Sequence, residues 1–253
     1  MTVKELYEKI NEKIPETLRL PWDNDGIMCC TDSTAPARRV LVALDVTEEV
    51  VDYAINGGFD LIISHHPLIF KPLSSLSDEN HISRKVIKLI NSGVSVFSFH
   101  TRADIVEGGV NDILADIVGL YSAEPFGEGG LGRIGVLDEE CSLEDFASSV
   151  KLSLGVDSLR VSDGYNTVKR VAVVGGDGKD FIKDAILAGA DTFVSGRIGY
   201  NVMEEASEMG INLIEAGHFF TEHPVTEFFA NIIGHISPEI YVQIVNSNLI
   251  KII

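Results

Sequence analysis

Cysteine is scarce in this 253-residue chain: there are three cysteines, and two of them, Cys29 and Cys30, are adjacent. This spacing does not suit a disulfide framework, and no C-x-x-C pair is present to hold zinc through thiolates. Long apolar runs are also absent, since no stretch approaches the roughly 18 uninterrupted residues of a membrane span. The amino terminus lacks a secretory signal pattern. We therefore predict a cytoplasmic protein with no membrane partner.

Positive charge is the next shortage. The sequence has 20 Lys and Arg residues against 38 Asp and Glu residues, which gives a formal net charge of -18. The basic residues are scattered, apart from short pairs such as Arg38-Arg39 and Lys169-Arg170. An acidic chain gains little from the release of counterions by phosphates, and its overall field repels nucleic acid. We therefore do not expect a nucleic-acid partner.

What the chain does contain is a regular alternation of short apolar runs with amphipathic segments. This alternation, with short connections, indicates an α/β fold with mostly parallel sheets. Thr2 and Glu5 have the spacing of a capping box at the start of the first helix. Predicted strands cover 40–44, 61–64, 94–99, 133–137, 159–162, 168–174, 192–195, 212–215, 241–245 and 249–252, and the main predicted helices cover 3–14, 48–56, 83–92, 108–118 and 142–154.

A glycine-rich stretch without apolar periodicity, residues 121–132, separates the two halves of this pattern. We predict two interlinked α/β domains, residues 1–125 and 126–253. The last ~40 residues are expected to carry the G-H-x-x-T-E motif and to pack back on the first domain. The sequence therefore predicts two sheets, with a metal site between the domains at the carboxyl ends of the strands.

Two adjacent histidines, His65 and His66, follow the apolar run Leu61-Ile62-Ile63, and Pro67 ends the strand. Open α/β sheets place their ligand sites at the carboxyl ends of strands. Neighbouring residues of an extended strand point to opposite faces, so two imidazoles that leave in different directions suit two metal ions better than one. The alternative is that both histidines are ordinary core or surface residues.

Two further strand ends carry residues of the same chemical type. His100 and Asp104 follow one, and His218 and Glu222 follow the other. Nitrogen and oxygen ligands without sulfur suit Zn, Fe(II), Mn or Co, and such a number of ligands suits two ions that activate a shared water. A second copy of the pattern, His223 and Glu227, is interpreted as a surface pair or as support for the first copy.

The turn Gly175-Gly176-Asp177-Gly178 could hold a phosphate on backbone N–H groups. The alternative is that its glycines only allow close strand–helix packing. Arg197, at the end of another predicted strand, has a side chain well shaped for phosphate. We therefore predict substrate contacts at Gly176, Asp177 and Arg197, and the alternative for Arg197 is a surface residue.

The sequence resembles the NIF-three-like (YbgI-type) proteins, many of which carry the name GTP cyclohydrolase 1 type 2 homologue. The resemblance covers nearly the whole chain, and its motifs are Ile62–Phe70, His100–Asp104 with Gly108–Asn111, and Gly217–Glu222; shorter matches include Trp22-Asp23-Asn24 and Leu44-Asp45-Val46-Thr47. It implies a two-domain α/β protein assembled as a toroidal homohexamer with two divalent metal ions per subunit. The implied metal ligands are His65, His66, Asp104, His218 and Glu222, with Glu222 bridging.

The resemblance implies that His100 is a nearby acid/base residue in the opening of a purine ring by metal-bound hydroxide. Two departures from the family pattern bear on this: Arg197 follows a glycine where relatives carry an acidic residue, and Arg102-Ala103 replaces Asn-Leu. Two functions remain open on the sequence. One is a metal-dependent hydrolase acting on a nucleotide-like small molecule, and the other is a non-catalytic hexameric metal-binding scaffold or protein-interaction factor.

Overall fold

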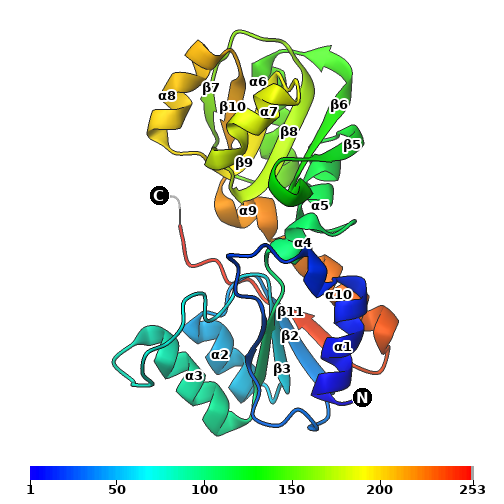
Figure 1. Cartoon of the computed structure of the whole chain (residues 1–253), viewed down its shortest axis with the longest axis vertical. Coiled ribbons are helices and arrows are strands. Elements are labelled where there is room, and N and C mark those ends of the chain that lie inside the picture. Colours follow the sequence, from blue (N-terminus) through cyan, green and yellow to red (C-terminus); the bar gives the residue numbers. More distant parts are fainter. Residues whose placement is uncertain (252–253) are drawn as a thin grey trace. The chain divides into compact units, whose positions relative to one another are not determined.

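The computed structural model describes residues 1–251, and the chain divides into two compact units (Figure 1). The first unit contains Met1–Val106 and Val225–Lys251, and the second contains Glu107–Pro224. The predicted boundary at residue 125 falls inside a strand of the second unit, because the chain enters that unit earlier, at Glu107. The segment that returns to the first unit begins after the G-H-x-x-T-E motif, at Val225.

A five-stranded sheet in the order β1-β4-β3-β2-β11 forms the centre of the first unit. Strands β4, β3, β2 and β11 are parallel, and β1 is antiparallel to β4. Helices α2 and α3 lie on one side of the sheet, and α1 and α10 lie on the other (Figure 1). The elements are α1 (Val3–Lys13), η1 (Glu16–Leu18), β1 (Gly26–Cys29), β2 (Arg39–Ala43), α2 (Glu48–Asn56), β3 (Leu61–Ser64), α3 (His81–Ser92), β4 (Ser95–Ser98), α4 (Thr101–Ile105), α10 (Val225–Ile236) and β11 (Tyr241–Ile244).

The second unit contains a six-stranded sheet in the order β5-β6-β8-β9-β10-β7. Its centre, β8-β9-β10, is parallel, and the outer pairings are antiparallel. The elements are α5 (Val110–Ile117), β5 (Tyr121–Phe126), η2 (Glu128–Gly130), β6 (Gly132–Cys141), α6 (Leu143–Leu154), β7 (Arg160–Ser162), β8 (Val168–Asp177), η3 (Lys179–Phe181), α7 (Ile182–Leu187), β9 (Thr192–Arg197), α8 (Tyr200–Met209), β10 (Asn212–Glu215) and α9 (His218–Glu222). The α/β class predicted from the sequence is therefore confirmed.

Each unit has its own apolar core. In the first, Leu41, Ile62 and Val96 of the central strands pack with Val51 of α2 and Leu89 of α3. These side chains are fully buried or nearly so, and burial of side chains of this size contributes about 1.5–3 kcal/mol each. The strands read as continuous apolar runs because parallel strands are covered on both faces.

The second core follows the same plan with other elements. Val171, Val194 and Ile214 come from the three parallel strands, and Leu114 of α5 and Phe146 of α6 pack against them. Because both cores are anchored on parallel strands, the carboxyl ends of those strands are held in fixed positions within each unit.

Local sequence signals define several helix ends. Thr2 Oγ1 accepts from the N–H of Glu5, and the Glu5 carboxylate accepts from the N–H of Thr2, so the predicted capping box is confirmed. Ser142 caps α6 in the same way by accepting from the N–H of Asp145. Gly93 ends α3 in the left-handed region, with φ of 72°, where a residue without Cβ is favoured.

Among the strands, three main differences from the sequence prediction stand out. Strand β1 is absent from the predicted strands because it is a short edge strand whose pairing register is broken. Strand β5 lies in the stretch predicted as a linker, because five of its six residues are exposed and it contains Pro125, which edge strands tolerate. The predicted strand 249–252 is wrong for Leu249–Lys251, which are irregular, and Ile252 lies outside the described residues.

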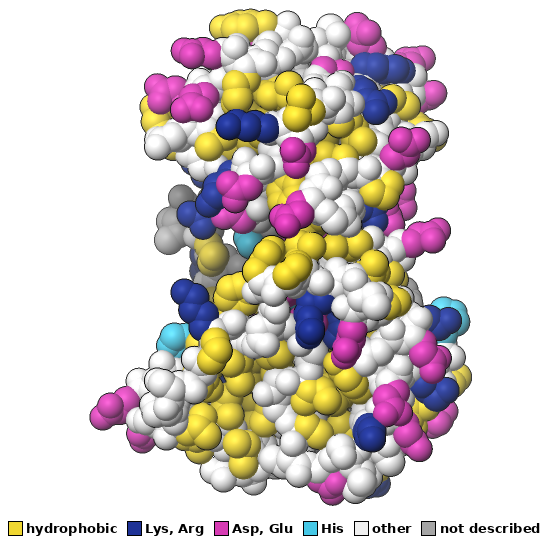
Figure 2. Space-filling model, viewed as in Figure 1, with side chains coloured by type: hydrophobic (Ala, Val, Ile, Leu, Met, Phe, Trp, Pro, Cys, Tyr) yellow, Lys and Arg dark blue, Asp and Glu magenta, His cyan; other side chains and the backbone are white. Residues whose placement is uncertain are grey.

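The surface reflects the acidic composition. On the face shown in Figure 2, Asp and Glu side chains are spread over both units, and Lys and Arg side chains lie singly or in small groups. Within residues 1–251, no helix has the length and hydropathy needed to cross a membrane.

Candidate metal-binding site

Three histidines of the first unit lie together where two neighbouring strands end. His65 and His66 follow β3, and His100 follows β4 after one residue. Strands β3 and β4 are parallel, with Ser64 opposite Ser98, so their carboxyl ends are adjacent. The nearest nitrogen atoms of the three rings lie within 4.8 Å of one another. The clustering that strand ends predicted is therefore present within this unit.

The chain turns at this point because the two serines hold it. Their hydroxyl groups are 2.8 Å apart, and Ser64 Oγ donates to the carbonyl of His66 at 2.9 Å. The N–H of His66 donates to the carbonyl of Leu44, which belongs to the connection after β2. These bonds explain how two adjacent histidines can leave an extended strand and still reach one site.

Each of the three imidazoles has its Nδ1 engaged by the protein. Nδ1 of His65 donates to the carbonyl of Phe99 at 3.0 Å, that of His66 to Asp45 Oδ1 at 2.7 Å, and that of His100 to Asp23 Oδ1 at 2.8 Å. A histidine whose Nδ1 carries the proton has Nε2 as its ligating nitrogen. Metal-binding histidines are oriented in this way by carboxylates and backbone carbonyls.

Asp104 adds a carboxylate to this cluster. It lies on the short helix α4, and its Oδ1 is 3.6 Å from Nε2 of His65. The two nearest atoms are thus an imidazole nitrogen and a carboxylate oxygen, a donor pair that zinc and other divalent transition metals accept.

Asp23 is a site residue that the sequence analysis did not identify as functional. Its carboxylate accepts from Nδ1 of His100 and from both the N–H and the hydroxyl of Thr101. Burial alone would raise the pKa of Asp23, but the hydrogen bond and positive charge of His100, with the bonds from Thr101, lower that pKa to about 2. The only sequence signal was its place in the Trp22-Asp23-Asn24 motif.

His100 responds to the same arrangement. Burial lowers its pKa, but the hydrogen bond to Asp23 and the negative charge of Asp104 outweigh burial, so the net pKa is raised. A histidine held by a buried carboxylate in this way can exchange a proton at Nε2 while the Nδ1 proton stays in place. This environment suits the acid/base role that the family resemblance implies.

Arg102 explains one of the two departures from the family pattern. Its side chain is completely buried and donates to Asp25, to the side chain of Asn11 and to the carbonyl of Ile14. The guanidinium also lies 4.5 Å from the ring centroid of Phe99. Arg102 therefore anchors α4 to the N-terminal segment of its own unit and does not serve as a surface contact.

In the second unit, His218 and Glu222 occupy successive turns of α9, directly after β10. Nε2 of His218 lies 2.9 Å from Glu222 Oε2. Gly176 and Gly196 approach this pair closely: a Cβ at Gly176 would overlap the Glu222 carboxylate, and a Cβ at Gly196 would lie 2.7 Å from the Cα of His218. The pair can occupy this position only because the next-to-last residue of each of the two neighbouring strands, β8 and β9, is glycine.

The second copy of the motif is arranged differently. The ring of His223 stacks on Phe219, with centroids 4.5 Å apart and an interplanar angle of 18°. Glu227 is exposed in the first turn of α10, which belongs to the other unit. The sequence prediction that the first copy is the ligand pair is therefore retained.

In the turn at the end of β8, the N–H groups of the three glycines already have acceptors within the protein. The N–H of Gly175 donates to Asn111 Oδ1, that of Gly176 to Thr221 Oγ1, and that of Gly178 to the carbonyl of Arg197. The alternative explanation, that glycine is needed here for close strand–helix packing, therefore accounts for these residues. The side chain of Asp177 is exposed to solvent. Its Oδ2 lies 3.8 Å from Nη1 of Arg197 and 3.6 Å from Nζ of Lys179, so its negative charge is partly neutralised.

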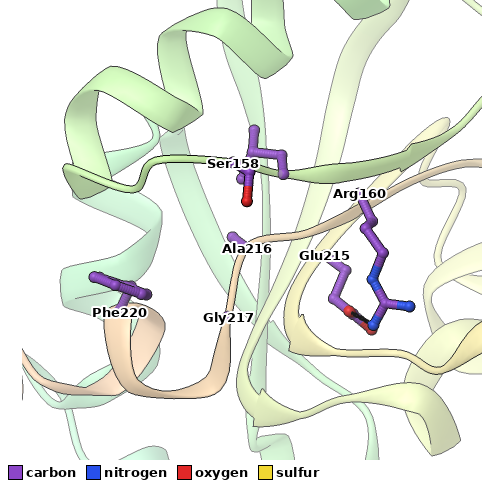
Figure 3. A pocket seen from close by; sticks show the side chains of 7 residues that line it. Ser158, Arg160, Glu215, Ala216, Gly217 and Phe220 are labelled. Atoms are coloured by element: carbon purple, nitrogen blue, oxygen red, sulfur yellow. Dashed lines mark hydrogen bonds and ion pairs between the residues drawn. The ribbon is translucent and has the colours of Figure 1, made fainter. Parts of the chain in front are cut away.

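A pocket of about 160 Å³ lies in the second unit beside the turn into α9 (Figure 3). Glu215 and Arg160 form a hydrogen-bonded ion pair in its wall, and Glu215 also accepts from the N–H groups of Ile198 and Gly199. Burial raises the pKa of Glu215, but these bonds outweigh it and lower the pKa overall. Glu215 thus fixes the end of β10, from which His218 follows.

Comparison with known proteins agrees with the motif-based resemblance. A family model described as Duf34/NIF3 (NGG1p interacting factor 3) matches residues 1–251. A Clostridium perfringens protein named GTP cyclohydrolase 1 type 2 homolog is 36% identical over 232 residues, which cover 89% of this chain and 88% of the relative. A Clostridium acetobutylicum protein of the same name is 34% identical, with 88% and 86% covered.

Solved structures show the same fold. The crystal structure of a hypothetical protein from Staphylococcus aureus aligns with a TM-score of 0.90 at 28% identity and covers 100% of this chain and 99% of its own. Reduced HcgD from Methanocaldococcus jannaschii aligns with a TM-score of 0.85 at 26% identity, with 96% and 97% covered.

Proposed function

We propose that this chain, which belongs to the Duf34/NIF3 family, binds two divalent metal ions and hydrolyses a nucleotide-like small molecule with their help. The observation that carries the proposal is the set of three histidines whose Nδ1 atoms are all engaged by protein acceptors. This arrangement leaves Nε2 of His65 and His66 to bind metal and Nε2 of His100 to exchange a proton. The proposed ligands are His65, His66, Asp104, His218 and Glu222, with Glu222 as the bridging carboxylate.

The residues fit such ions by their chemistry. Imidazole and carboxylate ligands without thiolate suit Zn, Fe(II), Mn or Co. A bound pair of such ions would supply a hydroxide nucleophile near neutral pH. His100 would then move protons at Nε2, while Asp23 holds the Nδ1 proton. The names of the relatives support ring opening of a purine nucleotide as the reaction to test first.

Beyond the metal ligands, substrate contacts are proposed at Gly176, Asp177 and Arg197. Asp177 and Arg197 are the exposed polar residues where β8 and β9 end. Gly176 contributes by the room it leaves for the Glu222 carboxylate. Substitution of Arg197 by Gln is expected to raise the KM for a phosphorylated substrate more than it lowers kcat, because guanidinium binds phosphate in the ground state as well.

The first experiment is the metal content of untagged protein purified without chelator, compared with a His65→Ala/Glu222→Ala variant. About two ions per chain are expected in the wild type and far fewer in this variant. A matched control, His235→Ala/Glu227→Ala, removes the same residue types from α10 and should keep the metal. Less than about half an ion per chain, unchanged by anaerobic reconstitution with Zn, Mn, Fe(II) or Co, would overturn the proposal.

A second candidate function is a non-catalytic metal-binding scaffold, and the family description as an interacting factor favours it. We infer from the resemblance that the chain forms a homohexameric ring, which either function can use. Sedimentation of the purified protein tests the assembly, and a screen of nucleotides for metal-dependent hydrolysis separates the two functions. Turnover that disappears in the His65→Ala/Glu222→Ala variant would favour the hydrolase, whereas a hexamer with bound metal and no turnover would favour the scaffold.

A further inference from the structure

Two exposed aromatic side chains flank His100 in the first unit and are not needed to bind metal. Trp22, the only tryptophan of the chain, is 55% exposed, and Phe70 is 44% exposed. Large aromatic side chains are normally buried for most of their surface. Two of them next to a candidate catalytic histidine therefore call for an explanation other than the fold.

The three rings form a corner. The centroids of Trp22 and Phe70 are 6.5 Å apart with an interplanar angle of 66°, and those of Trp22 and His100 are 6.4 Å apart at 78°. The ring centroids of Phe70 and His100 are 6.2 Å apart, with an interplanar angle of 86°. Rings that meet edge to face do not cover one another, so an exposed ring keeps a face on which a planar ligand can stack. We call these three residues the aromatic corner.

The backbone around the aromatic corner is held in place. Nδ2 of Asn24 donates to the carbonyl of Ile69 at 2.5 Å, which ties the neighbours of Trp22 and Phe70 together. Asp23 binds both His100 and Thr101 on the other side of the same turn. A surface that is ordered before binding costs less to fix when a ligand arrives.

The aromatic corner adjoins the histidine cluster. The ring centroid of His100 lies 5.2 Å from that of His65 and 5.8 Å from that of His66. A ring that stacks in the corner would thus lie beside the nitrogen atoms that we propose as metal ligands. Since the chain carries a net charge of -18, its overall field does not attract a polyphosphate, and the ring itself has to supply much of the affinity.

We propose that Trp22 and Phe70 form the binding surface for a planar aromatic heterocycle of purine type, whose edge then faces His100. This inference rests on the proposed function for the identity of the reaction, but the stacking itself needs no metal. It names the base as the part of the substrate that the first unit recognises. Stacking of a base on aromatic side chains is tolerant of sequence because every base has a π-face, so related purines should all bind.

The sole tryptophan makes the test direct, because all indole fluorescence of the chain comes from Trp22. Guanosine, adenosine and GTP are titrated into the full chain, both after treatment with chelator and after loading with Zn, and ribose 5-phosphate serves as the ligand without a base. We expect saturable quenching by the three purines with and without Zn, and none by ribose 5-phosphate. Phe70→Ala should weaken purine binding about tenfold, and Phe70→Tyr should restore it. The control Tyr200→Ala, which removes an exposed aromatic of the second unit, should leave it unchanged.

The outcomes separate this inference from the proposed function. If the protein does not take up metal but purines still quench Trp22, the quenching supports the aromatic corner, and the missing metal counts against the metal-dependent reaction only. Metal-dependent turnover without any purine-specific quenching would overturn the aromatic corner and leave the reaction standing. Emission typical of a buried indole that no ligand changes would also overturn it, because Trp22 would then be covered by another subunit.

Discussion

At the scale of single residues, the role of each histidine depends on the group that holds its Nδ1. The sequence could predict His65, His66 and His100 because a polar residue that directly follows an apolar strand lies at a sheet edge where ligands bind. It could not predict Asp23 as a partner of His100, since 77 residues separate them and only the folded chain brings them together. Local patterns indicate candidate ligands, whereas the residues that orient them come from distant segments.

Asp23→Asn tests whether Asp23 orients His100. An amide can either donate to or accept from Nδ1, so the variant should no longer fix one tautomer, and any turnover should fall about 10- to 100-fold. The measurement is the pair of side-chain ¹⁵N chemical shifts of His100, together with metal content. Asp45→Asn is the matched control: it faces His66 and should weaken metal binding without changing the tautomer of His100. Unchanged His100 shifts in Asp23→Asn would contradict the assignment.

Gly176→Ala tests whether space at this glycine positions Glu222. The new Cβ would overlap the Glu222 carboxylate and lie 3.1 Å from Nε2 of His218, so both side chains must shift. We expect a loss of about 1–3 kcal/mol in the free energy of unfolding and at least tenfold weaker metal binding. Gly155→Ala has nearly the same positive φ, 64° against 65°, but its Cβ meets nothing within 4 Å. This control should lose stability from backbone strain alone and keep its metal affinity.

At the scale of elements, the strongest patterns gave the right structure. Strands β2, β3 and β10 were predictable because buried parallel strands are continuous apolar runs, and α1 and α6 because their caps are local. Strands β1 and β5 were not, because an edge strand is half solvated and its pairing partner decides whether it forms. The same limit applies to α4, whose five residues are held by contacts of Arg102 that no local pattern indicates.

Arg102→Met tests whether this buried arginine holds α4. Removal of the guanidinium leaves the Asp25 carboxylate buried without its main partner, which is expected to cost about 3–5 kcal/mol in the free energy of unfolding at pH 7. Burial raises the pKa of Asp25, and the charge of Arg102 opposes this rise. In the variant the folded-state pKa is therefore raised further above its unfolded value.

A raised carboxyl pKa destabilises the fold above that pKa, and this penalty shrinks as Asp25 becomes protonated on lowering the pH. The difference in the free energy of unfolding between Arg102→Met and the wild type, measured with urea, should therefore be smaller near pH 5 than at pH 7. Arg19→Met is the control: its side chain is partly exposed, lies 3.8 Å from Asp25, and should cost less than about 1 kcal/mol. A difference that does not change with pH would contradict the role of Asp25.

At the scale of the whole molecule, the chain order of the two units has consequences for folding. The second unit is one continuous segment, whereas the first is completed only when α10 packs on α1 and β11 pairs with β2. Tyr241 lies opposite Arg39, and a pairing across so many residues leaves no local trace in the sequence. The sequence could therefore predict two α/β parts and a C-terminal segment that packs back on the first, but not that this segment begins only at Val225, after the G-H-x-x-T-E motif.

The proposed ligand set takes His65, His66 and Asp104 from the first unit and His218 and Glu222 from the second. If the ions bind both groups of ligands, metal must stabilise both units together, by about 2.7 kcal/mol at a free concentration one hundred times the Kd. Hydrogen exchange of peptides from β3 reports the stability of the first unit, and that of peptides from β9 reports the stability of the second. The amides of both strands should become more protected from exchange when metal is added. In Glu222→Ala the added metal should protect β3 much less, although the substitution lies in the other unit, whereas Glu227→Ala should behave as the wild type. Equal protection of β3 in Glu222→Ala and wild type would mean that the first unit binds metal by itself, through the histidine cluster and Asp104 alone.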